Sequence, residues 1–428
     1  MKKIMLMGLL LTTTSFLFAQ NIDAIINSKE VERIEKVLSS DDMRGRRTFT
    51  PDIDRAADFI AAEFKAIGLL TWNNSNSYRQ EFAMVRSKLT SASATIDGAT
   101  IDPKNIAVIS CQADLKIDQS SGYEIATIKA GSNLNREVAA FTQSNKNMLV
   151  FADTSYAPNF SRLSSSRRAT FKTDKSVILV LGNFVPKNFS IEAKLEITEQ
   201  KLANVVGILP GKSKKEEYVI FSGHYDHLGV TGQPVNGDSI YNGANDDAAG
   251  TTAVIMLAKY FKQLNNNERT IVFAAFTAEE VGGYGSQYFS RQFDAAKVMA
   301  MFNIEMIGTE AKWGKNSAYI TGYEKTDMGS MLQKNLEGTG FTFYPDPYTT
   351  QNLFYRSDNA TLARLGVPAH TISTAKMDGE PNYHKVSDEI TTLDMDNMAM
   401  IIKSVALSSR SIVAGKETPT RVKVEDLR

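Results

Sequence analysis

One apolar run, residues 218–221 (YVIF), ends just before a polar stretch that carries two of the four histidines in the chain. The run is short and uncharged, which predicts a buried strand. His224 and Asp226 follow it, where an α/β sheet places its active site. On a continuing strand these two side chains would share a face. The Asp226 carboxylate could then hold one imidazole nitrogen while the other binds a metal.

From about residue 204 onward, apolar runs alternate with helical patterns. This alternation predicts an α/β fold with a mixed, mostly parallel sheet and helices on both faces. Strands are expected at 205–209, 218–221, 270–276, 298–304, 318–320 and 369–372. Helices are expected at 247–264, 285–293, 327–336, 358–365 and 395–413.

The first part of the chain has a different texture. Helical patterns cover most of residues 22–70, interrupted by a polar loop at 39–50 whose arginines are expected to be solvated. Short β-like runs without histidine follow up to about residue 194, which predicts an inserted, mainly β domain. The expected division is therefore a leader at 1–19, an N-terminal part of the main domain at 20–86, an insert at 87–197 and the main catalytic domain at 198–428.

The leader has the features of a secretory signal peptide. Lys2 and Lys3 precede an uncharged stretch from residue 4 to 18, and Ala19 is a small residue at the expected cleavage point. The stretch is shorter than the roughly 20 residues that span a bilayer. We therefore expect export to the periplasm or the medium, with no membrane anchor after cleavage.

Charge and cysteine content limit the kinds of function. Lysine plus arginine equals aspartate plus glutamate, at 48 each, so no global field attracts nucleic acid. Cys111 is the only cysteine, which excludes an internal disulfide and zinc sites built from cysteines. Any metal must be held by histidine, aspartate and glutamate.

Further polar groups follow apolar runs: Asp246 with Asp247, Glu279 with Glu280, Glu305, and Tyr383 with His384. Adjacent carboxylates at the edge of a core repel each other unless a positive group lies beside them. A metal would supply that charge, with one carboxylate as ligand and the other as base on an activated water. The plainer alternatives are solvated acids at a helix start for the glutamates and a helix cap for the aspartates.

Taken together, these segments resemble peptidase family M28, the di-zinc aminopeptidases and related glutamate carboxypeptidases. The segments that carry the resemblance are 222–229 (SGHYDHLG), 242–250 (NGANDDAAG), 278–282 (AEEVG), 302–308 (FNIEMIG) and 383–388 (YHKVSD). The resemblance implies the phosphorylase/hydrolase-like zinc peptidase fold. The insert resembles a protease-associated domain in texture and position.

The resemblance also implies the roles of single residues. Five side chains would hold two zinc ions: His224, Asp246, Glu280, Glu305 and His384. Asp246 would bridge, with His224 and Glu305 on one ion and Glu280 and His384 on the other.

Three further residues receive roles in the same way. Glu279 would be the general base and later the acid, Tyr383 would aim its phenol at the developing oxyanion, and Asp226 would orient His224. His227 and His370 receive no ligand role, and His370 is expected to be a core histidine.

Two positions depart from the family pattern. Residue 305 is glutamate where many relatives have aspartate, so its carboxylate reaches one methylene further. Asn359 stands where a similar Ser-Asp-His segment of the family has histidine, which puts a substrate-side role of that segment in doubt.

The resulting expectation is an exported zinc-dependent exopeptidase, an aminopeptidase acting on peptides. One alternative is a glutaminyl cyclase, although the cyclases keep a single zinc and the full ligand set argues against them. A glutamate carboxypeptidase would need a basic cluster, for which Arg356 and Lys376 are candidates. A binding module without catalysis is the third alternative, and the oligomeric state is left open.

Overall fold

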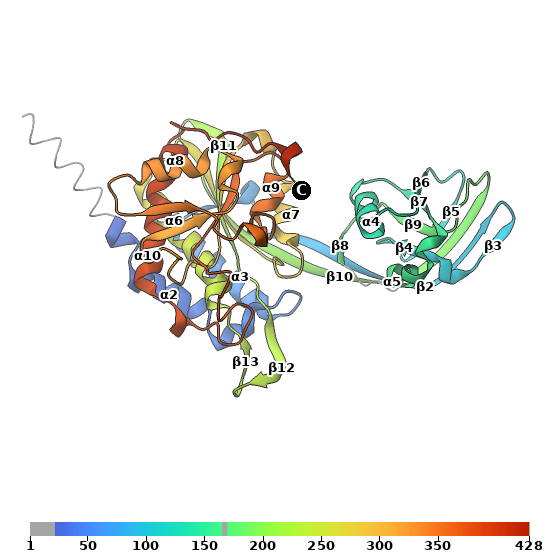
Figure 1. Ribbon diagram of the computed structural model, residues 1–428, viewed down its shortest axis with the longest axis horizontal. Helices are drawn as coiled ribbons and strands as arrows, with labels where there is room; N and C mark the ends of the chain where they lie inside the picture. Colours follow the sequence, from blue (N-terminus) through green and yellow to red (C-terminus); the bar gives the residue numbers. More distant parts are fainter. Residues whose placement is uncertain (1–21, 165–168, 428) are drawn as a thin grey trace, which may run out of the picture. The chain divides into compact units, whose positions relative to one another are not determined.

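A computed structural model describes residues 22–164 and 169–427. The predicted signal peptide at 1–19 therefore lies outside the described residues. The chain divides into two compact units, with Phe82–Lys201 as the second unit and the rest of the described chain as the first. The boundaries expected for the insert, 87 and 197, lie within that second unit. Figure 1 labels helices and strands of both units.

The first unit is built on a mixed sheet with the strand order β17-β16-β18-β15-β11-β14-β10. Four central strands run parallel: β18 (Ala369–Ser373), β15 (Val298–Ile304), β11 (Lys214–His224) and β14 (Arg269–Phe276). The end of β10 (Phe189–Leu209) pairs antiparallel with β14. On the other side, β16 (Ser317–Ile320) pairs antiparallel with β18 and parallel with β17 (Thr342–Pro345).

Hydrophobic residues cover both faces of this sheet. Phe221 and Phe273 lie in the core on one face, whereas their neighbours Ile220 and Val272 lie in the core on the other. This alternation is the period-two pattern of a strand that is buried on both sides.

Helices complete both cores. The first is covered by α2 (Ser28–Leu38), α3 (Asp52–Ile67), α6 (Ala249–Leu264), α8 (Met328–Asn335) and α10 (Met395–Ser408), and the second by α7 (Tyr284–Ser290) and α9 (Asn359–Ala363). The predicted α/β fold with helices on both faces is confirmed (Figure 1).

The register of the parallel strands sets the position of the site. His224 at the end of β11 is level with Phe276 at the end of β14, and Phe221 is level with Phe302 in β15. The three strands therefore end at the same edge of the sheet. A short π-helical turn, Ala244–Ala248, precedes α6 at this edge, and the hairpin of β12 (Gly229–Val235) and β13 (Asp238–Tyr241) follows the end of β11.

The second unit contains the smaller sheet β4-β9-β7-β6, formed by Ile106–Ile109, Val177–Leu181, Met148–Ala152 and Glu124–Ile128. The strands β2 (Arg79–Ile96), β3 (Ala99–Ile101), β5 (Asp114–Asp118), β8 (Ala169–Phe171) and most of β10 form its remaining β-structure. Two helices, α4 (Leu134–Gln143) and α5 (Ala157–Ser164), were not expected from the sequence. Buried Val138 and Phe160 attach them to the small sheet.

Among the described residues, no helix is both long enough and apolar enough to cross a membrane.

Candidate metal centre

The polar residues singled out in the sequence meet at the carboxyl edge of the central strands. His224 is the last residue of β11, and Glu305 follows the last residue of β15. Glu279 and Glu280 come shortly after the end of β14, and His384 lies in the loop beyond β18. Because parallel strands share this edge, residues far apart in the sequence become neighbours.

Asp246 lies at the centre of the group and is 2% exposed. Its Oδ1 is 3.2 Å from His224 Nε2, and its Oδ2 is 3.2 Å from His384 Nε2. Oδ2 is nevertheless buried without a hydrogen-bond partner among the described residues. The two oxygens of one carboxylate thus face two different imidazoles.

Glu280 and Glu305 belong to two different groups of ligand atoms that share Asp246. Glu280 Oε2 is 3.2 Å from His384 Nε2. Ligand atoms of His224, Asp246 and Glu305 all lie within 4.8 Å of one another, as do those of His227, Asp246 and Glu280. The five predicted ligands are therefore brought together, and His227, for which no ligand role was expected, lies with them.

Backbone amides explain why Asp246, and not Asp247, is available to a ligand. Asp247 Oδ1 accepts hydrogen bonds from the amides of Gly250 and Met306, and its Oδ2 accepts one from the amide of His224. The Asp247 carboxylate therefore ties three segments together. In the described part of the chain, no backbone amide donates to the Asp246 side chain.

Asp388 holds the backbone of Asp246 through its carboxylate. Its Oδ2 accepts the Asp246 amide at 3.0 Å, and its Oδ1 accepts the Asn245 amide at 2.9 Å. Asp388 is 1% exposed and comes from the loop that also carries His384. Asp388 belongs to the segment 383–388 that carries the family resemblance. Nothing in the sequence pattern, however, predicts that its carboxylate binds the amides of Asn245 and Asp246.

Asp226 contacts His224 differently from the prediction. The His224 Nδ1 is 3.1 Å from the backbone oxygen of Asp226, whereas the carboxylate Oδ1 is 3.8 Å away. That carboxylate instead accepts hydrogen bonds from the Thr48 hydroxyl at 2.8 Å and from the amides of Glu279 at 3.0 Å and Glu280 at 3.4 Å. Asp226 thus fixes the backbone of the glutamate pair.

The loop at 39–50 corrects a further expectation. Arg46 is fully buried, and its guanidinium donates to the backbone oxygens of Leu38, Tyr225, Asn242 and Gly243. The prediction of a solvated loop is wrong for this residue, because these carbonyls supply the partners that water would otherwise provide.

His370 lies apart from the cluster, within β18. Its two ring nitrogens contact the Thr321 backbone oxygen at 2.8 Å and the Thr326 hydroxyl at 2.7 Å. Burial lowers the pKa of His370 to about 4. It is a buried core histidine whose two nitrogens are satisfied.

The charges in the cluster perturb each other strongly. Burial raises the pKa of Glu279 well above its usual range, and Glu305 acts in the same direction. Burial also raises the pKa of Glu305 to about 7. Contacts with Asp246 and Glu280 raise the pKa of His384 to about 10. Carboxylates that are packed this closely need a positive charge among them.

The donor set fits divalent zinc. Imidazole and carboxylate are ordinary zinc ligands, and catalytic sites use three protein ligands for each ion. The buried Asp246 Oδ2 and Glu305 Oε2 both lack hydrogen-bond partners among the described residues, as atoms reserved for a cation would. One group of ligand atoms comprises His224, Asp246 and Glu305, and the other comprises His227, Asp246 and Glu280. His384 Nε2 lies 3.2 Å from both Asp246 Oδ2 and Glu280 Oε2, beside this second group.

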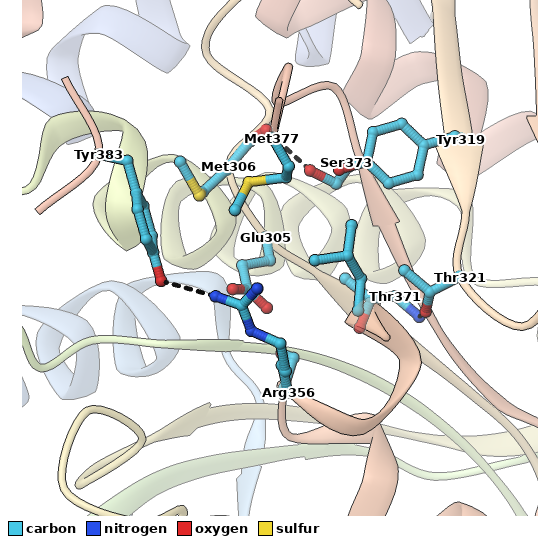
Figure 2. Close-up of a pocket in the computed structure, with 11 residues that line it drawn as sticks. Glu305, Met306, Tyr319, Thr321, Arg356, Thr371, Ser373, Met377 and Tyr383 are labelled. Atoms are coloured by element: carbon cyan, nitrogen blue, oxygen red, sulfur yellow. Dashed lines mark hydrogen bonds between the residues drawn. The ribbon is translucent and has the colours of Figure 1, made fainter. Parts of the chain in front are cut away.

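A cavity of about 40 Å³ opens beside Glu305. Its wall combines apolar and hydroxyl side chains with one cation, and comprises Glu305, Met306, Tyr319, Thr321, Leu353, Arg356, Ser357, Thr371, Ser373, Met377 and Tyr383. Figure 2 shows the Arg356 guanidinium facing the Tyr383 hydroxyl, 3.5 Å away. The Tyr383 ring in turn stacks on His384, with 3.9 Å between ring centroids.

The residues of this site fall within a stretch that matches a known protein family. The model of peptidase family M28 matches residues 204–408, which include all five predicted ligands. A probable zinc metalloprotease of Pyrenophora teres f. teres is 35% identical over 109 residues, which are 25% of this chain and 23% of that protein. Aminopeptidase Y of Saccharomyces cerevisiae is 25% identical over 217 residues, covering 45% of this chain and 38% of that protein.

The fold has relatives among solved structures. A zinc aminopeptidase from Bacillus subtilis superposes with a TM-score of 0.54 at 17% sequence identity, covering 94% of this chain and 98% of that chain. By contrast, the sequence match spans only about a quarter of the length of the zinc metalloprotease of Pyrenophora teres f. teres.

Proposed function

We propose, on the premise that residues 204–408 belong to peptidase family M28, that this protein is a zinc-dependent exopeptidase that removes N-terminal residues from peptides. One observation carries the proposal. The two oxygens of Asp246 lie 3.2 Å from His224 Nε2 and from His384 Nε2, so that one carboxylate joins two sets of ligand atoms. Such a bridging carboxylate suits a co-catalytic metal pair.

The residues divide between two zinc positions. His224 and Glu305 would hold the first ion, Glu280 and His384 the second, and Asp246 both. When bound, such a pair polarises a carbonyl group and lowers the pKa of water. Zinc itself is supported by the fit of the donor set and by the unpartnered oxygens of Asp246 and Glu305.

Glu279 would move the proton. Its backbone amide donates to Asp226 Oδ1 at 3.0 Å, which holds the residue at the site. Burial raises the pKa of its carboxyl well above the usual range, which favours its accepting a proton. Glu279 would take the proton from the attacking water and give it to the leaving amine, as a general base and then a general acid.

Tyr383 would donate to the carbonyl oxygen as negative charge develops there. An Arg356 N–H points at its hydroxyl oxygen, which leaves the phenolic proton for another acceptor. Burial, with Asp246 and Glu305 nearby, raises the pKa of the phenol, so it keeps its proton at neutral pH.

In this proposal the cavity beside Glu305 receives the side chain of the residue that is removed. Glu305 Oε2 is buried without a hydrogen-bond partner among the described residues, and Glu305 lines the cavity. Met306, Leu353 and Met377 give the cavity an apolar wall for the first side chain.

A second candidate follows from Arg356, the cation on the cavity wall. A guanidinium recognises carboxylates, so the position of Arg356 favours a glutamate carboxypeptidase-like activity as the alternative. The experiment is hydrolysis of a peptide library with free N-termini and of its N-acetylated counterpart, each with and without a chelator. Chelator-sensitive cleavage of the free peptides alone supports the aminopeptidase. Cleavage of both sets from the C-terminus supports the carboxypeptidase.

Export is part of the proposal and rests on the residues of the leader. Lys2 and Lys3, the uncharged stretch and Ala19 have the order that a secretory signal requires. Mass spectrometry of protein recovered from outside the cytoplasm should give a mature N-terminus at Gln20. An intact Met1 in that fraction would contradict cleavage.

A further inference from the structure

His227 contacts the proposed zinc site although it is not among the five ligands. Its side chain is fully buried, and its Nδ1 lies 2.8 Å from Glu280 Oε1. The family resemblance implies no ligand role for this residue. The contact therefore adds a side chain to the three proposed ligands around the second zinc position.

The chemistry of the pair fixes the direction of the hydrogen bond. An ionised carboxylate can only accept, so the proton must sit on His227 Nδ1. Glu280 then uses its two oxygens differently. Oε1 is held by His227, and Oε2 faces His384 Nε2 at 3.2 Å. A carboxylate held in this way cannot rotate freely about its terminal bond.

The backbone of His227 is held and its ring packs closely against Gly243, while its Nε2 is buried without a hydrogen-bond partner among the described residues. Its backbone amide donates to the Arg46 oxygen at 3.2 Å. A Cβ atom built on Gly243 would lie 2.5 Å from His227 Cδ2 and 2.3 Å from the Asp246 backbone oxygen. Any side chain at 243 would therefore displace the imidazole. The turn that delivers Asp246 thus leaves room for His227 through Gly243.

Direct coordination by His227 is less well supported by the same distances. His227 Nδ1 lies 4.0 Å from Asp246 Oδ2. His384 Nε2 is 3.2 Å from both Asp246 Oδ2 and Glu280 Oε2, so it lies closer to the place where these oxygens meet. The Nδ1 proton directed at Glu280 also excludes a metal from that nitrogen.

We propose that His227 is a positioning residue that holds Glu280 Oε1, so that Oε2 faces the second zinc position. The proposal rests on the assignment of Glu280 under the proposed function. Hydrogen-bond partners of metal ligands orient those ligands, and losing one typically weakens metal affinity by about 10- to 100-fold.

The test is a zinc titration of the metal-free protein against a competing fluorescent chelator, which resolves two binding steps without measuring activity. His227→Ala should weaken one step by about 10- to 100-fold and leave the other unchanged. His227→Asn places an amide N–H near the position of Nδ1 and should restore that step. His227→Gln is a neutral control of similar polarity. Its amide lies one methylene further from the backbone than the position of Nδ1, so it should not restore that step.

The outcomes separate this inference from the proposed function. Two zinc steps in the wild type with no change in His227→Ala would overturn the inference alone. So would equal weakening of both steps, or a failure of Asn to restore the weakened step while Gln does so. Absence of zinc binding by the wild-type protein would overturn the proposed function itself. Because Asn and Gln are compared directly, the test stands even if the alanine variant folds poorly.

Discussion

The carboxylate of Asp388 accepts a hydrogen bond from the backbone amide of Asp246, 3.0 Å away, although 142 positions separate the two residues. Its other oxygen accepts the amide of Asn245. The loop that carries His384 therefore also fixes the turn that carries the proposed bridging ligand. Assembly of the site depends on this loop docking against that turn.

Asp388→Ala should therefore lower both stability and metal affinity. Removing the carboxylate leaves two buried amides without acceptors, at a cost of about 1 to 3 kcal/mol each. Urea unfolding and zinc titration measure the two effects. Asp394→Ala is a matched control, because Asp394 caps α10 through the Asn397 amide and, among the described residues, its hydrogen bonds involve no proposed ligand. It should cost about 1 kcal/mol of stability without changing zinc affinity. Normal zinc binding by Asp388→Ala would contradict the proposed support.

Glu279→Gln should remove most peptide hydrolysis while both zinc ions stay bound. The amide cannot accept the proton, and the loss of a general base costs about 100- to 10,000-fold in kcat. The backbone contact with Asp226 survives the substitution, so the position of the loop should not change. Glu280→Gln is the contrasting variant, because it should weaken zinc binding directly. Near-normal turnover by Glu279→Gln would exclude the role of this residue as base.

Tyr383→Phe should lower kcat on the order of 100-fold with little change in KM, because its proton is needed only as charge develops on the carbonyl oxygen. Phenylalanine retains the ring that stacks on His384. Steady-state kinetics on one good peptide substrate provide the measurement. A rise in KM with unchanged kcat would assign Tyr383 to substrate binding instead.

Glu35 predicts a pH dependence of stability away from the metal ligands. It is fully buried, its Oε2 accepts the Thr252 hydroxyl at 2.8 Å, and burial raises its pKa to about 8. The unfolded chain releases this proton near its ordinary pKa of about 4.3. The folded state therefore binds more protons over the intervening range, and stability must fall as the pH rises from about 4.3 to about 8.

Glu35→Gln should remove that part of the dependence. Urea unfolding of the metal-free proteins at pH 5 and pH 8 gives the comparison, since the metal ligands are then common to both proteins. The fall in unfolding free energy should be larger for the wild type, by up to about 4 kcal/mol from the pKa shift. Equal falls in the two proteins would show that Glu35 is ionised in the folded state.

The strand ends and the residues after them could be predicted from the sequence, because uncharged runs interrupted by His, Asp and Glu report burial followed by abrupt polarity. His224, Glu279, Glu280 and Glu305 were found in this way. The partners that hold them were not. Whether the imidazole of His227 reaches Glu280 depends on the space left by Gly243, and whether Asp388 reaches Asp246 depends on how a distant loop docks. Neither contact leaves a periodic signal in the chain.

Dependence on tertiary contacts also explains the predictions from sequence that were wrong. Arg46 looked like a solvated loop residue because its acceptors are backbone oxygens, which any sequence provides. Asp226 was expected to bind His224 through its carboxylate, but that carboxylate is occupied by Thr48 and by the amides of the glutamate pair. The two helices of the second unit lie between strands, where short apolar patterns favoured β-structure.

The most direct test of the account is the zinc content of purified, metal-reconstituted protein, compared between the wild type and Asp246→Ala. If one carboxylate joins both positions, the wild type should hold two zinc ions per chain and the variant should hold none after the same dialysis, with its circular dichroism spectrum unchanged. A wild type that holds a single ion, or a variant that keeps one of its two, would contradict the bridging role of Asp246.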